Sequence, residues 1–123
     1  MENEDKKNEN KNVGIGCLTV VVIMIVAYFI FSPSKETEMA IDAYVTTQTH
    51  VKKYLKSPAS AEFQPFRKEI VKKTGENSFE INSYVDSQNG FGAMLRSKYL
   101  IRMHKNGDDW FCDYFELDGK RLN

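Results

Sequence analysis

The longest run of apolar residues in this chain lies near its N-terminus. Residues 13–31 read VGIGCLTVVVIMIVAYFIF, which is 19 residues without a charged side chain. At about 1.5 Å per residue, a helix of that length spans roughly 28 Å, close to the thickness of the hydrocarbon layer of a bilayer. Such a helix satisfies its own backbone hydrogen bonds, and Pro33 stops it. The pattern predicts one transmembrane helix from Val13 to Phe31.

Three other interpretations of this run fit less well. A cleavable signal peptide stays open because Ser32 and Ser34 give a small-x-small pattern, although the run is long and the tail before it is not basic. A lipoprotein is disfavoured because the apolar residues follow Cys17, whereas lipidation needs them before it. A core helix of a soluble protein is disfavoured because no other segment is apolar enough to surround it.

The tail that precedes the run, residues 1–12, is polar and low in complexity, so we expect it to be disordered. It carries Lys6, Lys7 and Lys11, whereas Lys35 alone is close to the other end of the run. Because lysine and arginine accumulate on the cytoplasmic flank of a span, we expect the N-terminus in the cytoplasm and the C-terminal domain outside.

Residues 35–123 predict one small soluble domain of the α+β class. Between residues 35 and 56, apolar side chains recur at three- and four-residue steps, which predicts an amphipathic helix that Pro58 ends. The remainder alternates with a period of two residues, which predicts strands at residues 69–73, 79–86, 95–104 and 110–117. The turn KNGDD at residues 105–109 is typical of a hairpin. We expect the helix to pack on a three- to four-stranded antiparallel β-meander.

The alternation also predicts which strand residues share a face. One set is Phe79, Ile81, Ser83 and Val85, and the other is Leu95, Ser97, Tyr99, Ile101 and Met103. Between these two strands lies the loop QNGFGA at residues 88–93. We expect Phe91, which stands between two glycines, to fold back onto the core.

Composition narrows the function. The chain has 17 basic and 17 acidic residues, so no overall field attracts nucleic acid. Cys17 lies in the apolar run and Cys112 near the C-terminus, so we expect no disulfide and no zinc site. His50 and His104 have no second ligand at metal spacing. No catalytic, metal or cofactor-binding motif stands out, and we expect a protein that is not an enzyme and binds no cofactor.

Two groups of side chains are candidate contacts for a partner. The QNGFG loop combines polar side chains with exposed backbone, which suits a peptide, a glycan or a partner strand, although turn formation explains the same residues. The second group is a basic stripe on one strand face, which suits anionic headgroups or an acidic partner unless Asp113 and Glu116 balance it. The stripe consists of Arg96, Lys98, Arg102 and His104. The full candidate set is Asp86, Gln88, Asn89, Phe91, Arg96, Lys98 and Arg102.

Two motifs resemble those of a known family. Residues 55–63, LKSPASAEF, resemble the LKSPSSAKF signature of a widespread group of small, uncharacterised bacterial and phage domains. A second motif follows in the same order at residues 85–93, VDSQNGFGA, with Arg96 just after it. The resemblance covers roughly residues 40–117. It implies a helix before the first motif and a location in the cell envelope, and it implies no activity.

These observations together predict a membrane-anchored, non-enzymatic binding module of the cell envelope. Its expected partners are the lipid bilayer, through residues 13–31, and an unknown envelope protein. In a phage or prophage, the same layout suits interference with the DNA entry of another phage, that is, superinfection exclusion. Two alternatives stay open. One is a structural subunit that binds a membrane complex through its span, and the other is an envelope hydrolase whose site, from Asp86, His104 and Cys112, forms only on folding.

Overall fold

A computed structural model of the chain describes residues 9–123, with side-chain environments from Gly14 onward. It divides into two compact units, Met1–Ser34 and Lys35–Asn123, and each is described here by itself. The expected disorder of residues 1–8 lies outside the described residues. Residues 9–12, which we assigned to the same tail, form the first turn of a helix instead.

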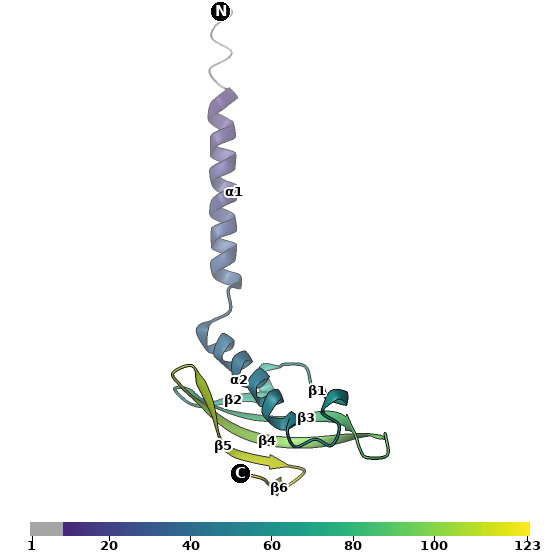
Figure 1. The fold of residues 1–123 in the computed structure, drawn as a ribbon. Helices are drawn as coiled ribbons and strands as arrows, with labels where there is room; N and C mark the ends of the chain where they lie inside the picture. Colours follow the sequence, from purple (N-terminus) through teal and green to yellow (C-terminus); the bar gives the residue numbers. More distant parts are fainter. Residues whose placement is uncertain (1–8) are drawn as a thin grey trace, which may run out of the picture. The chain divides into compact units, whose positions relative to one another are not determined.

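The first unit contains helix α1 (Glu9–Phe31) (Figure 1). Its segment Gly14–Phe31 is long and apolar enough to cross a membrane, and none of these 18 residues is buried within the structure. The segment is therefore not a core helix packed among the described residues. The helical hydrogen-bond pattern continues to Ser32, which donates its backbone N–H to the carbonyl of Tyr28 four residues earlier (2.9 Å). Three residues, Ser32 to Ser34, separate α1 from the next helix.

The second unit begins with helix α2 (Lys35–Lys52), which ends four residues earlier than the sequence pattern predicts. At its end the backbone N–H groups of Lys53, Tyr54 and Leu55 each bond to the carbonyl three residues before. This tighter pattern narrows the last turn and stops the α-helix before Pro58 is reached. Acidic residues in the first turn and basic residues in the last turn complement the helix dipole.

Six strands follow and form one antiparallel sheet. Its central meander has the expected order, but the sequence pattern predicted only three or four strands. The strands are β1 (Glu62–Phe63), β2 (Val71–Gly75), β3 (Ser78–Gln88), β4 (Met94–Asn106), β5 (Asp109–Leu117) and β6 (Lys120–Arg121). They lie in the order β1-β3-β4-β5-β6, and β2 pairs with the same edge of β3 as β1 does, nearer the start of that strand.

The core lies between α2 and one face of the sheet, and Figure 1 shows α2 lying across that face. From α2 it takes Ala43, Tyr44, Thr47 and Val51, and from the sheet Phe79, Ile81, Val85, Tyr99, Ile101, Met103 and Phe115. The Thr47 hydroxyl lies 3.1 Å from the sulfur of Met103, and the Tyr44 hydroxyl donates to the carbonyl of Gln64. The second unit thus carries a complete core of its own.

The period-two alternation in β3 is confirmed, since Phe79, Ile81, Ser83 and Val85 are all buried. In β4 it holds only in part. Tyr99 is buried, whereas Leu95, which we placed on the same face, is 53% exposed. The reason is that β5 pairs with β4 only as far as Tyr99, which lies opposite Leu117. The ribbon of residues 88–97 therefore projects beyond the covered part of the sheet, and we call it the hairpin extension.

Candidate functional site

The loop at the end of the hairpin extension is closed by Asn89. Its side-chain oxygen accepts hydrogen bonds from the backbone N–H groups of Phe91 (2.9 Å) and Ala93 (3.0 Å). Its backbone N–H donates to the carbonyl of Ala93, and its carbonyl accepts from Gly92. Gly92 has a φ of +80°, a conformation that glycine adopts without steric cost. Asparagine forms such local bonds readily, so the QNGFG motif encodes one defined loop shape.

Phe91 stands at the outside of this loop and is 98% exposed. The expectation that it folds back onto the core is wrong, because the loop lies beyond the part of the sheet that α2 covers. Met94 and Leu95, at the start of β4, are 48% and 53% exposed. Leaving a phenyl side chain in water forgoes roughly 2 kcal/mol of burial. Phe91 therefore contributes little to the stability of this domain. We call the three exposed apolar residues Phe91, Met94 and Leu95 together the hairpin tip.

Next to the hairpin tip, Asp86 on β3 and Arg96 on β4 form a bidentate ion pair. Arg96 Nε and Nη2 each donate to one Asp86 carboxylate oxygen at 2.8 Å. The guanidinium also lies 3.8 Å from the centre of the Tyr84 ring. The hydrogen bonds from Arg96 lower the pKa of Asp86, and those to Asp86 raise the pKa of Arg96. These contacts tie the two strands together just where the ribbon leaves the rest of the sheet.

The predicted basic stripe lies on the face of the sheet away from α2, but its charges are balanced. Arg102 Nε lies 2.7 Å from Glu80 on β3, and His104 Nδ1 lies 2.8 Å from the Asp113 carboxylate. The expected role of Asp113 is confirmed. That of Glu116 is wrong, because it accepts a hydrogen bond from the Tyr114 hydroxyl instead (2.6 Å). Among the described residues, Lys98 is the one member of the stripe whose side chain has no carboxylate partner.

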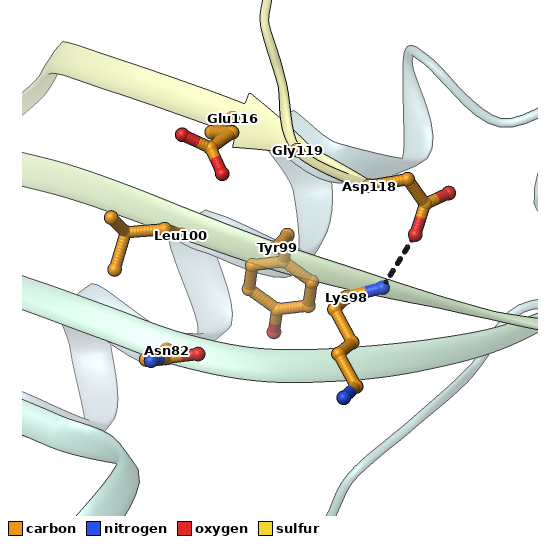
Figure 2. Close-up of a pocket in the computed structure, with 7 residues that line it drawn as sticks. All are labelled: Asn82, Lys98, Tyr99, Leu100, Glu116, Asp118 and Gly119. Carbon is orange, nitrogen blue, oxygen red and sulfur yellow. Dashed lines mark hydrogen bonds between the residues drawn. The ribbon is translucent and has the colours of Figure 1, made fainter.

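Lys98 lines a shallow hollow of about 420 Å³, shown in Figure 2. The hollow lies on the face of the sheet away from α2, which we call the open face. Its backbone N–H donates to the Asp118 carboxylate (2.9 Å), and Asp118 returns a bond from its own N–H to the Lys98 carbonyl (2.8 Å). In Figure 2 the Lys98 side chain extends away from Asp118, toward the side of the hollow where Asn82 lies. The hollow is lined by one ammonium group, one amide and the carboxylates of Glu116 and Asp118, so its charges do not favour an anionic ligand.

A second hollow, of about 300 Å³, lies on the other face, between the end of α2 and the hairpin extension. Its floor is partly apolar, because Leu55, Leu95 and Leu117 line it, and Lys56 contributes a charge. We call it the inner groove. No ion pair engages Lys52, Lys53 or Lys56 within residues 14–123. Lys52 Nζ lies 5.8 Å from the centre of the Phe63 ring on β1, whereas Lys56 lines the groove itself together with Asp118.

The structure separates the three residues of the suggested hydrolase site. Asp86 pairs in register with Arg96, whereas His104 lies opposite Ser78, eight positions away on β3. At about 3.3 Å per residue, the two side chains are about 26 Å apart along the strand. Cys112 pairs with buried Met103 and packs against the core, so it faces away from His104. These residues form no common site.

The remaining reactive side chains have structural surroundings. His50 packs edge-on against Phe115, with ring centres 5.3 Å apart, and burial lowers its pKa. Burial raises the pKa of Cys112, whose thiol donates to the Tyr114 carbonyl (3.6 Å). Across the part of the chain that the structure describes, no three histidine, cysteine, aspartate or glutamate residues come together as a metal site would require.

Comparison with known proteins gives no relative: no family model, no curated protein and no solved structure matches this chain. The resemblance of its two motifs to a family of envelope domains stays a prediction. Within that prediction the structure places the motifs side by side, since Ser60 of the first accepts a hydrogen bond from the backbone of Gln88 in the second (2.9 Å). Sequence reasoning missed Met94 and Leu95 as surface residues, because alternation alone assigns Leu95 to the core.

Proposed function

We propose that this protein is a membrane-anchored, non-enzymatic binding module that contacts a partner protein through its hairpin tip. The observation that carries the proposal is Phe91, which is 98% exposed on a loop that Asn89 holds in one shape. Aromatic side chains that are rigidly presented to water are common anchors of protein interfaces. The ion pair of Asp86 and Arg96 supports the strands behind it.

Helix α1 supports the membrane anchor in this proposal, because one apolar helix of this length suffices to hold a domain at a bilayer. Lys6, Lys7 and Lys11 precede the span, which favours a cytoplasmic N-terminus and, in this proposal, a partner outside the cytoplasm. A partner of the cell envelope, including a channel used by an entering phage genome, fits this location.

The experiment is site-specific photo-crosslinking of the full chain in its native membrane. A photoreactive phenylalanine analogue replaces Phe91 in one variant and Phe111 in a matched control. Phe111 is also exposed (47%), but it stacks on His104 near the opposite end of β4. We expect Phe91 to yield a defined crosslinked product of higher mass that the Phe111 variant lacks. Equal products from both positions, or none from Phe91, would contradict the proposal.

Topology has a separate test. In a Cys112→Ser background, a cysteine introduced at Asp108, in the exposed β4–β5 turn, provides one accessible thiol. An impermeant maleimide should label it on intact cells. Labelling only after the membrane is opened would place the domain on the cytoplasmic side.

The alternative of a structural subunit predicts that the sequence of α1 itself matters. All of its residues from Gly14 to Phe31 lack buried surroundings, so each face is available to another helix. Rearranging this segment into another apolar sequence of equal length should leave the Phe91 crosslink intact under our proposal. Loss of the crosslink with normal membrane insertion would favour the subunit.

A further inference from the structure

The edge of β4 within the hairpin extension has no neighbour. Strand β5 pairs with β4 from Asn106 back to Tyr99 and then leaves it at Leu117. Asp118 and Gly119, with φ values of +50° and +78°, turn the chain away toward β6, which pairs with β5 only. Residues 94–97 of β4 therefore have β3 on one side and no strand on the other, and we call this segment the open edge.

The direction of the backbone groups on the open edge follows from the hydrogen bonds of the residues around it. Lys98 directs both its N–H and its carbonyl toward Asp118, away from β3. In an antiparallel pair, this direction repeats at every second residue, so Arg96 and Met94 also face away from β3. The opposite strand agrees, because the Tyr84 carbonyl and the Gln88 N–H both bond to groups on the far side of β3.

Exposed strand edges promote pairing with other chains, and proteins usually shorten, charge or cover them. This edge carries two exposed apolar residues, Met94 and Leu95, and its one charge, Arg96, is neutralised by Asp86. The inner groove lies beside it, lined by Leu95, Ser97 and Leu117. A strand added here continues the line of β5 and places alternate side chains over the groove.

We infer that the open edge binds an extended, acidic segment of the partner protein by strand addition. The positive charge comes from Lys56, which lines the groove together with Asp118, and from Lys53 just after α2. Neither lysine has an ion pair within residues 14–123. A second copy of this chain brings the same lysines to the same place, so like charges oppose self-pairing. This inference rests on the proposed function and specifies how the partner binds.

The test compares two variants at one position. Arg96→Pro removes the outward N–H of the open edge but no bond to β3, whereas Arg96→Gln keeps that N–H. Both variants lose the ion pair with Asp86 equally, so the backbone group is the intended difference. The probe is an eight-residue peptide of alternating threonine and glutamate, added to the full chain in detergent micelles. A peptide with lysine in place of glutamate is its control.

The readout is the NMR signal and exchange rate of each backbone amide. We expect the glutamate peptide to protect the amides of Met94 and Arg96, and the lysine peptide to bind at least tenfold more weakly. Arg96→Gln should keep the affinity within about threefold, and Arg96→Pro should lower it about tenfold, the size of one lost backbone hydrogen bond. Continued slow exchange of the amides of Leu95 and Ser97, which face β3, confirms that the hairpin remains folded in each variant.

Several results would overturn the inference. These are no protection by millimolar peptide, equal affinity of the two variants, equal binding of the lysine peptide, or protection of the open edge by self-association without peptide. The proposed function fails separately. If the Phe91 crosslink persists in Arg96→Pro, the strand addition is wrong and the binding module stands. If Phe91 gives no crosslink at all, the binding module is wrong, whatever the peptide does.

Discussion

The two ends of strand β4 differ in how their side chains contact the rest of the domain. At the β4–β5 turn, Lys105 Nζ and Trp110 Nε1 both donate to the Asp42 carboxylate on α2 (2.9 Å each). The Trp110 ring also packs near Phe79, with centres 6.1 Å apart. At the β3–β4 loop, Phe91 touches no core residue and is 98% exposed. The first end is held to α2 by hydrogen bonds. The second has a defined loop conformation, but its aromatic side chain is exposed to solvent. This arrangement is expected where the aromatic side chain serves binding and not stability.

The largest expected contrast is between Phe115 and Phe91. Phe115→Ala removes a ring that is fully buried beside His50 and Tyr54, and should lower the free energy of unfolding by about 3–5 kcal/mol. Phe91→Ala should change it by less than about 0.5 kcal/mol. Urea unfolding followed by circular dichroism measures both. A cost above 1–2 kcal/mol for Phe91→Ala, roughly the range of a buried contact, would mean that the ring is structural after all.

A smaller effect on the free energy of unfolding is expected in the β4–β5 turn. Gly107 has a φ of +65°, which a residue with a Cβ adopts at a cost of about 1–2 kcal/mol. Gly107→Ala should therefore destabilise the domain by about that amount. Gly90→Ala is the matched control in the other loop, because Gly90 has no positive φ and no atom within 4 Å of an added Cβ. Thermal unfolding of both variants should separate them by several degrees.

The hydrogen bonds from Lys105 and Trp110 to Asp42 should contribute less to the free energy of unfolding, because the Asp42 side chain is 49% exposed. Asp42→Asn should cost no more than about 1 kcal/mol at neutral pH. The hydrogen bond from Lys105, followed by that from Trp110, lowers the pKa of Asp42 from 3.8. The contribution of the carboxylate is thus complete above pH 3.8 and is lost as the pH falls through the lower folded-state value. A difference between wild type and Asp42→Asn that persists unchanged at pH 2, about two units lower, would contradict this assignment.

A small effect on stability is also expected at Asn89. Asn89→Ala removes two hydrogen bonds of an exposed loop and should cost less than about 1 kcal/mol. Its effect on order should be clear, because the amides of Phe91 and Ala93 lose their acceptor and exchange faster with solvent. Asn82→Ala, an exposed asparagine on the open face, serves as the control. Unchanged exchange at Phe91 would show that the two glycines alone set the loop shape.

The period-two pattern predicted the core face of the sheet correctly where the helix covers it. It identified Phe79, Ile81 and Val85 on β3, and Tyr99, Ile101 and Met103 on β4. It failed at Leu95, because a local pattern contains no information on where β5 and α2 end. The two-residue strands β1 and β6 were missed for a related reason, since tertiary pairing, and not an alternating sequence, defines them.

The candidate contacts show the same limit. The composition of residues 88–93 indicated a defined loop, and the structure contains it. Whether Phe91 packs onto the core depends on the length of the hairpin extension, and the local sequence pattern does not predict that length. The basic stripe was identified, yet two of its acidic partners, Glu80 and Asp86, lie on β3 and emerge only from the register of the strands.

The connection between the two helices has a kinetic consequence. Only Ser32, Pro33 and Ser34 separate α1 from α2, and three residues reach at most about 11 Å. In the proposed anchored protein, such a short connection keeps the start of the domain within that reach of the end of the span. A partner that also resides in that membrane then meets it by lateral diffusion in two dimensions, at a high effective concentration. A modest intrinsic affinity is sufficient under those conditions, and rapid dissociation is compatible with frequent encounters.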